Sequence, residues 1–227
     1  MARAKPAGKL AEIADAALTA FGRNGFRLTQ MSDIAKLCGM SAGALYGYVD
    51  NKEALLYVAV LKGLGSLDPA MPLPVHAAST GDLVAVLKRE IGGRSLWPHL
   101  KAALTRERSG NLADEAREIA GELYDLIAQE RRLIRLFSIC SRDVPEIAEF
   151  HTYEVRGRYL TDFSAYLAKR HAGGQIKAEL ATPAAARAVI EMVAWMAAHR
   201  HNEAIQMQVT EAEARVTVQA FFAAAVA

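Results

Sequence analysis

Residues 26–48 have the sequence FRLTQMSDIAKLCGMSAGALYGY, a pattern of two short helices joined by a tight turn. Thr29 stands where the N-cap of the first helix is expected. Gly39 lies in the turn and tolerates a positive φ without steric cost. Ser41 can then cap a second helix over residues 42–48. The segment therefore predicts a helix-turn-helix.

The second helix of this motif combines small side chains with tyrosines. Its small residues are Ala42, Gly43, Ala44 and Gly47. Small residues let a helix and its amides come close to a phosphodiester backbone. Tyr46 and Tyr48 offer hydroxyls to phosphates and ring faces to base edges, and Lys52 adds a positive charge at the start of the next helix. The pattern indicates DNA binding, although a plain helical hairpin with both tyrosines in the core fits the spacing equally well.

The segments on either side of the motif are expected to be helical too. Apolar residues at i, i+3 and i+4 predict a helix from Leu10 to Phe21, and Gly25 marks its end. Asn51 is placed to cap a further helix that runs to about Leu61. Residues 66–79 contain three prolines and are expected to form a linker.

Beyond this linker, every segment with a clear period is helical. The expected helices are residues 82–91, 96–107, 114–141, 145–171, 183–200 and 211–226. Thr182 and Thr210 precede the last two as N-caps. No alternating strand pattern of useful length occurs. The sequence therefore predicts an all-α fold, with a helix-turn-helix domain at residues 1–62 and a larger helical domain at residues 63–227.

Composition excludes several classes of protein. Hydrophobic residues make up 52% of the chain and charged residues 23%, which excludes intrinsic disorder. No uncharged stretch reaches about 18 residues, so no membrane-spanning helix is expected. The two cysteines, Cys38 and Cys140, cannot build a disulfide framework and fit a reducing, cytoplasmic setting. Residues 1–62 hold eight basic and five acidic residues, against 19 and 20 in the remainder, so the positive excess lies with the motif.

Several motifs of the first quarter resemble those of a known family. They are Ile13-Ala14-Asp15-Ala16-Ala17-Leu18, Phe21, Asn24-Gly25-Phe26, Asp33-Ile34-Ala35, Gly39-Met40-Ser41, Gly43-Ala44-Leu45-Tyr46 and Asn51-Lys52-Glu53-Ala54-Leu55. In this order, without gaps over about residues 10–62, they resemble the TetR family of bacterial transcriptional regulators. The resemblance implies binding of a double-stranded DNA operator, a small-molecule effector in the helical domain, and a homodimer. The remaining residues match only in helical layout.

The resemblance also implies which residues contact DNA. The positions carried over are Thr29, Met31, Ser41, Ala42, Gly43, Tyr46, Tyr48 and Lys52. Thr29 would cap the first helix of the motif and contact a phosphate. This chain departs from the family at Ala42, where Lys or Arg is common, and at Gly47, where a large polar or aromatic residue is common. Base readout would then depend on few side chains, assisted by Arg3, Lys5 and Lys9 in the minor groove.

The effector pocket is expected in the larger helical domain. A helix around residues 119–137 has one apolar stripe, with Glu130 at its centre. A carboxylate there is costly unless it is paired. Glu130 therefore either pairs internally, with Arg94, His99 or His151 as candidates, or it receives a ligand. The residues expected to line the pocket are Trp97, His99, Ile127, Glu130, Phe137, His151 and Tyr159.

The last two helices are unusually apolar. A helix that is apolar on more than one side is buried on more than one side. The resemblance implies that two such helices from each protomer pack as a four-helix bundle. The expected interface residues are Val189, Val193, Met196, Val218, Phe221 and Phe222.

Motifs of enzymes and metal sites are weak or missing from the sequence. His199-Arg200-His201 has no carboxylate or cysteine at ligand spacing, so no metal is expected. No H-E-x-x-H, Walker, G-x-S-x-G or G-x-G-x-x-G motif occurs, so neither an enzyme nor a cofactor is expected. The chain is predicted to be a transcriptional regulator, most simply a repressor released from its operator by a small molecule. The alternative is an effector-binding or interaction protein of the same fold whose DNA binding is lost or altered.

Overall fold

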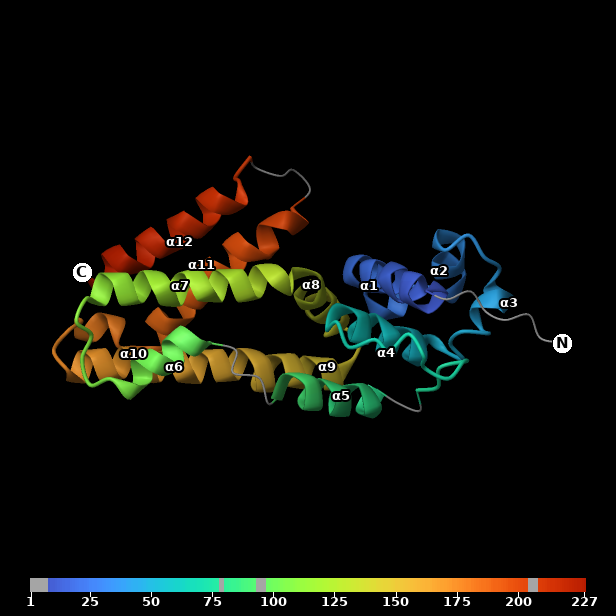
Figure 1. The fold of residues 1–227 in the computed structure, drawn as a ribbon, viewed down its shortest axis with the longest axis horizontal. Helices are drawn as coiled ribbons and strands as arrows, with labels where there is room; N and C mark the ends of the chain where they lie inside the picture. The colour runs from blue at the N-terminus through green and yellow to red at the C-terminus, as the bar shows by residue number, and fades with distance from the viewer. Residues whose placement is uncertain (1–7, 78–79, 93–96, 204–207) are drawn as a thin grey trace. The chain divides into compact units, whose positions relative to one another are not determined.

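The computed structural model describes residues 8–77, 80–92, 97–203 and 208–227, and in these ranges the regular elements are helices. The helices are α1 (Lys9–Leu28), α2 (Met31–Leu37), α3 (Ala42–Leu45), α4 (Lys52–Gly63), α5 (Thr80–Gly92), α6 (Pro98–Thr105), α7 (Leu112–Gln129), α8 (Arg131–Cys140), α9 (Pro145–Glu149), the π-helix η1 (Phe150–Arg156), α10 (Gly157–Ala172), the 3₁₀ segments η2 (Ala178–Leu180) and η3 (His199–Asn202), α11 (Pro183–Ala197) and α12 (Glu211–Val226) (Figure 1). Within these ranges, Val49 and Val75 form an isolated β-bridge. The predicted all-α fold is confirmed.

The chain forms two compact units that are not contiguous in sequence. The first unit contains α1–α5 together with residues 132–151, and the second contains α6, α7, α10, α11 and α12. The predicted boundary after residue 62 separates the helix-turn-helix domain from the larger helical domain, and it stays a prediction. The compact unit around the helix-turn-helix extends further, because it includes most of α8 and all of α9.

In the first unit, α1 packs against α4, and α2 packs against both α1 and α3. The apolar series predicted for α1 is buried, with Ile13 and Phe21 fully enclosed. Gly25 interrupts α1 with φ +79° and ψ 176°, and the helix resumes to Leu28. A Cβ at Gly25 would lie 2.9 Å from Asp143 Oδ2. The expected helix end at Gly25 is therefore a kink that brings the chain close to Asp143.

Residues 132–151 are fastened to α1 by polar contacts. Arg132 Nη1 donates to Asp15 Oδ1 at 2.9 Å. Arg135 Nε donates to the Gly22 carbonyl at 2.9 Å. Because the Gly22 carbonyl belongs to the backbone of α1, the bond from Arg135 fixes the helix backbone and not only a side chain. A segment from the middle of the sequence thus supports the helix that precedes the motif.

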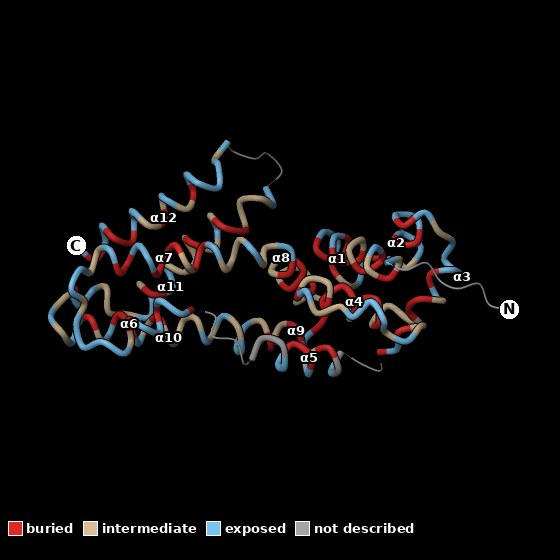
Figure 2. Tube along the Cα trace, viewed as in Figure 1, coloured by how far each residue is buried: buried red, intermediate tan, exposed pale blue. Residues whose placement is uncertain are grey.

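The second unit is a helical bundle in which α7 packs against α11 and α12, and α10 packs against α6 and α11. Buried segments recur along α7 (Figure 2). An aromatic series runs through its core: the ring centroids of Trp97 and Phe163 are 5.4 Å apart, and those of Phe163 and Phe222 are 5.3 Å apart. These rings come from different helices, so the series ties the bundle together.

A buried ion pair lies inside this bundle. Arg170 is fully buried, Glu115 is 6% exposed, and Arg170 Nε donates to Glu115 Oε1 at 2.7 Å. The Tyr166 hydroxyl donates to the same oxygen at 3.1 Å, and Arg170 Nη2 donates to the Ala103 carbonyl at 2.7 Å. The sequence pattern suggested a core carboxylate at Glu130. Among the residues that the structure describes, the buried carboxylate is that of Glu115.

Two expected helices differ from the prediction in their interior. The helix expected over residues 114–141 divides into α7 and α8, and Glu130 is the half-buried C-cap of α7. The helix expected over residues 145–171 contains the π-helix η1. Thr182 and Thr210 cap α11 and α12 as predicted. No helix in the described ranges has the length and apolar character needed to cross a membrane.

Candidate functional site

The helix-turn-helix has the turn and the second N-cap that its sequence predicts, but α3 ends at Leu45 and not at residue 48. Ser41 Oγ accepts a hydrogen bond from the Ala44 N–H at 3.1 Å and caps α3. Gly39, in the turn, has φ +62°. Leu45 is fully buried, whereas residues 41–44 are exposed. Leu45 therefore anchors α3 to the core and leaves its outer face open to solvent, as a recognition helix requires.

The outer face of α3 is small and carries a tyrosine at its end. A Cβ at Gly43 would meet nothing closer than Ser41 Oγ at 4.0 Å, so the space above Gly43 is open. Tyr46, the C-cap of α3, is 49% exposed. This face allows close approach of a DNA backbone, and Tyr46 is long enough to reach a base edge or a phosphate.

Lys52 begins α4, and its side chain is held in place. Lys52 Nζ donates to the Arg27 carbonyl at 3.1 Å and lies 4.7 Å from the centre of the Phe26 ring. Burial lowers the pKa of Lys52 from its ordinary value. Asn51 Oδ1 caps the helix by accepting the Ala54 N–H at 2.6 Å. A positioned ammonium at the N-terminus of a helix is suited to bind a phosphate.

Thr29 and Tyr48 lie elsewhere than expected for DNA contacts. Thr29 is 1% exposed, and its hydroxyl donates to the Gly25 carbonyl at 2.7 Å. Gln30, not Thr29, is the N-cap of α2. Thr29 lies four residues after Gly25, so its hydroxyl bonds back to the preceding turn of the chain and does not cap α2. Tyr48 is 6% exposed, which places its ring in the core.

The remaining expected contacts are divided between described and undescribed residues. Met31 begins α2 and is half-buried. Lys9 Nζ donates to the Cys38 carbonyl at 2.8 Å, so in this structure Lys9 is tied to the end of α2. Arg3 and Lys5 lie outside the described residues. The residues that the structure brings to an open surface are therefore Ser41, Ala42, Gly43 and Tyr46, with Lys52 close by at the start of α4.

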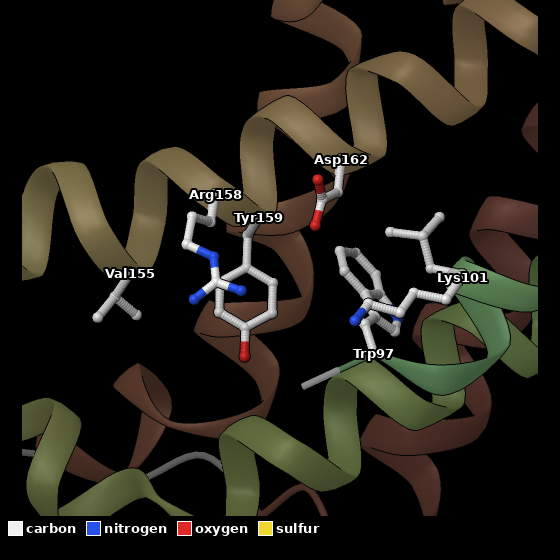
Figure 3. A pocket seen from close by; sticks show the side chains of 7 residues that line it. Trp97, Lys101, Val155, Arg158, Tyr159 and Asp162 are labelled. Atoms are coloured by element: carbon white, nitrogen blue, oxygen red, sulfur yellow. The ribbon is translucent and has the colours of Figure 1, made fainter. Parts of the chain in front are cut away.

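A narrow slot lies between α6 and α10 in the second unit (Figure 3). Its lining residues are Trp97, Leu100, Lys101, Val155, Arg158, Tyr159 and Asp162. The rings of Trp97 and Tyr159 meet edge to face with centroids 5.5 Å apart. The slot has a volume of about 350 Å³ including the part open to solvent, and its enclosed part has room for about one water molecule.

Two residues of the predicted effector pocket, Trp97 and Tyr159, share this slot. Burial raises the pKa of Tyr159 to about 12, so its hydroxyl stays protonated near pH 7. Three charged residues of the lining, Lys101, Arg158 and Asp162, were not predicted from the sequence. Their spacing carried a signal, because Lys101 follows Trp97 by four residues and Asp162 follows Arg158 by four, which places each pair on one helix face.

The other predicted pocket residues are dispersed. His99 lines a separate polar hollow, and Ile127 packs partly buried against the core of the second unit. Glu130 lies at the junction of α7 and α8. Phe137 and His151 belong to the first unit, where their ring centroids are 5.8 Å apart. The structure therefore does not gather the seven predicted residues around one cavity, and their role stays a prediction.

The six residues expected at a dimer interface differ in burial. Three are enclosed in the core of their own protomer: Val193, Val218 and Phe222. Two are partly buried against that core: Val189 and Met196. Phe221 is 64% exposed. An enclosed side chain has no surface to offer a partner. Large exposed side chains of α11 and α12 are instead Trp195, Val216 and Phe221.

Glu211 organises the polar end of α12. Arg131 Nη2 donates to Glu211 Oε2 at 2.8 Å, and Arg200 Nη2 donates to Oε1 at 2.6 Å. His201, from the His-Arg-His sequence, lies 3.0 Å from the same carboxylate. In the part of the chain that is described, no three His, Cys, Asp or Glu side chains are grouped to hold a metal ion.

Comparisons with known proteins agree with this architecture. Residues 13–58 match the family model of the bacterial regulatory proteins of the tetR family. No curated protein matches the sequence. A regulator assigned to the TetR family from Mesorhizobium loti MAFF303099 superposes with a TM-score of 0.52 at 18% identity, covering 98% of this chain and 96% of that one.

AibR, solved in complex with isovaleryl coenzyme A and operator DNA, superposes with a TM-score of 0.56 at 14% identity, covering 94% of this chain and 97% of that one. Apo AibR gives a TM-score of 0.51 at 16% identity with the same coverage. At these identities, the superpositions show a shared fold.

The exposed helix-turn-helix and the match of residues 13–58 support a DNA-binding transcriptional regulator. The match of residues 13–58 to the tetR family model agrees with the resemblance of the sequence motifs.

Proposed function

We propose that this chain is a homodimeric repressor that leaves its operator DNA when a small molecule binds the helical domain. The observation that supports this most is the geometry of the motif inside the family domain. Ser41 caps an exposed α3, and Lys52 is positioned at the start of α4. AibR, which has the same fold, has been solved with both a ligand and operator DNA.

The mechanism follows from the geometry of B-DNA. Two recognition helices of a dimer must reach successive major grooves, about 34–36 Å apart. An effector that binds better to a conformation with another separation shifts the population away from the DNA-bound form. Arg132 and Arg135 fasten residues 132–151 to α1, so we expect this segment and the helix-turn-helix to move as one body.

The test is a DNA-binding titration with the segment upstream of the protein's own gene, followed by fluorescence anisotropy at several salt concentrations. Lys52→Ala should weaken binding to all sequences about equally and reduce the salt slope by roughly 1, because one phosphate contact is lost. Lys177→Ala is the matched control, since Lys177 is an exposed lysine of the other unit. A changed sequence preference with an intact salt slope would contradict the phosphate role of Lys52.

A second pair of variants tests the recognition helix. Gly43→Val and Tyr46→Ala should abolish operator binding without changing helical content or molecular mass. The space above Gly43 is open in the free protein, so a valine there costs little until DNA approaches. Operator affinity unchanged in Gly43→Val would contradict the close approach of α3 to the backbone.

One observation favours a second function. The described helix α3 carries no Lys or Arg, and Tyr48 is enclosed, so few side chains are left for base readout. An effector-binding protein of the same fold with lost or altered DNA binding would show this. In the anisotropy titration, such a protein would bind the upstream DNA no better than unrelated DNA.

A further inference from the structure

The side chain of Lys52 is held by the backbone of Arg27, and the backbone of Arg27 is also held by Asp143. The Arg27 N–H donates to Asp143 Oδ2 at 2.9 Å, and the Arg27 carbonyl accepts from Lys52 Nζ at 3.1 Å. Only the N–Cα and Cα–C bonds of Arg27 separate these two backbone groups. Asp143 and Lys52 are therefore joined through a single residue, although they are far apart in the sequence.

Asp143 is itself fixed by the turn that follows α8. Its backbone N–H donates to the Cys140 carbonyl at 2.9 Å, and its side chain is only 19% exposed. The Arg27 guanidinium is 82% exposed, and its Nε lies 4.0 Å from Asp143 Oδ1. The close contact of the carboxylate is therefore with the backbone N–H of Arg27 and not with its charged group. This contact fixes the main chain at residue 27.

The kink at Gly25 makes room for this contact. A Cβ at residue 25 would lie 2.9 Å from Asp143 Oδ2, the same oxygen that accepts the Arg27 N–H. Because glycine has no Cβ, the carboxylate can reach the main chain two residues further on. The close approach of the turn after α8 to the chain before α2 therefore depends on the residue at position 25.

Asp143 also acts on Lys52 by its charge. Burial lowers the pKa of Lys52, whereas the carboxylates of Glu53 and Asp143 act in the opposite direction. Lys52 Nζ lies 4.7 Å from the centre of the Phe26 ring, and Lys52 begins α4, where the free amides of a helix N-terminus favour a phosphate. The charge of Asp143 and its bond to Arg27 thus both favour a charged ammonium at this place.

We propose that Asp143 is a positioning residue for DNA binding: it fixes the main chain of Arg27, which in turn holds the Lys52 ammonium where a phosphate binds. Asp143 belongs to residues 132–151, so a segment from the middle of the sequence controls one phosphate contact of the helix-turn-helix. The inference rests on the proposed function and deepens it, because it names a residue through which the state of this segment reaches the DNA contact.

The sign of the effect of Asp143→Ala separates this proposal from simple electrostatics. Loss of a negative charge near the motif should tighten DNA binding if charge alone matters. If Asp143 positions Lys52, Asp143→Ala should instead weaken operator binding roughly threefold to tenfold in the anisotropy titration. Glu146→Ala is the matched control, since it removes the charge of an exposed acid of α9 in the same compact unit, and it should not weaken binding.

Two further variants test the connection itself, with a thermal melt to show that each variant is folded. Asp143→Asn keeps an oxygen that can accept the Arg27 N–H, so it should retain most of the wild-type affinity. In a Lys52→Ala background, Asp143→Ala should cause no further loss, because the contact that it positions is already missing. A loss of the same size in both backgrounds, or operator binding that Asp143→Ala leaves unchanged or tightens, would overturn the proposal.

Acylation of Lys52, followed by mass spectrometry, tests the connection without DNA. In Asp143→Asn and in Asp143→Ala, Lys52 should react roughly twofold faster relative to the exposed Lys177 than in the wild type, because the carboxylate that favours the ammonium form is gone. Operator binding with unchanged affinity and unchanged acylation in these variants would refute the connection and leave the regulator intact. Faster acylation of Lys52 in a protein that does not bind operator would support the connection and refute the repressor.

Discussion

Gly25 holds a backbone conformation that other residues avoid. Its φ of +79° and ψ of 176° fall in a region essentially restricted to glycine, and a Cβ would lie 2.9 Å from Asp143 Oδ2. We expect Gly25→Ala to lower the free energy of unfolding by roughly 1–3 kcal/mol, measured by urea denaturation. Gly39→Ala is the comparison, since a Cβ there meets nothing within 4 Å. Equal losses in both variants would show that Asp143 contributes no steric cost.

The buried pair of Glu115 and Arg170 gives the second prediction for single residues. Glu115→Ala leaves a fully buried guanidinium without its carboxylate, so stability should fall by about 3–5 kcal/mol. Glu130→Ala removes a half-buried carboxylate at a helix junction and should cost less. Thermal melts of both variants show which substitution lowers the stability more. A larger loss in Glu130→Ala would make Glu130 the structural acid of this unit.

Local signals at single residues were predictable, and long-range burial was not. Ser41, Asn51 and Thr210 act as N-caps as predicted, because a cap depends on residues two or three positions away. The hydroxyl of Thr29 and the ring of Tyr48 instead turn inward. Their spacing alone fits both an outward and an inward orientation, so only the packing of neighbouring helices decides between them.

Among the helices, the start of α12 contains an acid whose charge stabilises the fold. Burial would raise the pKa of Glu211, but hydrogen bonds from Arg131 and Tyr124 outweigh it and hold the pKa at about 2, below the ordinary 4.5. A carboxyl with a depressed pKa stabilises the fold above its unfolded-state pKa. That stabilisation is lost as the pH falls from about 4.5 toward 2.

Glu211→Gln should therefore be less stable than the wild type at pH 7, and the difference should shrink below about pH 4.5. Chemical denaturation at a series of pH values measures this. Glu179→Gln, an exposed residue of η2, is the control and should follow the wild type throughout. A difference that is independent of pH would mean that the charge of Glu211 is not what stabilises α12.

Helix existence was predictable from apolar periodicity, but interruptions within helices were not. No glycine or proline marks the end of α7 near Glu130. Gly157 directly follows the π-helix η1, but a glycine at this position does not by itself predict a π-helix. Glu115 was missed for a related reason. It stands in the first turn of α7 beside Asp114, where acidic residues are common because of the helix dipole. Its burial depends on Arg170, which is 55 residues away in sequence.

At the scale of the whole molecule, the unexpected feature is that residues 132–151 pack with the N-terminal helices. The apolar stripe of each helix predicts which side of that helix is buried, but it does not predict which other helix packs against it. The contacts that choose the partner, such as Arg135 with the Gly22 carbonyl, join positions 113 residues apart. The motif and its family were therefore accessible from sequence, whereas the grouping of helices into units, and with it the lining of the slot, required the structure.

The proposed homodimer gives the last prediction, which depends on separating core residues from surface residues on α11 and α12. Phe221 is 64% exposed and Trp195 is 40% exposed, whereas Val193 is fully enclosed. Large exposed apolar side chains on neighbouring helices are typical of a surface that a partner covers. Phe221→Glu should therefore convert the dimer to a monomer in sedimentation velocity while its helical content is retained.

Val193→Asp should instead lower helical content and stability, because it places a charge in the core of the protomer. Tyr153→Glu, at a residue that is 73% exposed in η1, is the surface control and should remain dimeric. A wild type that sediments as a monomer at micromolar concentration would refute the dimer. A Phe221→Glu variant that stays dimeric would place the interface on another face of the chain.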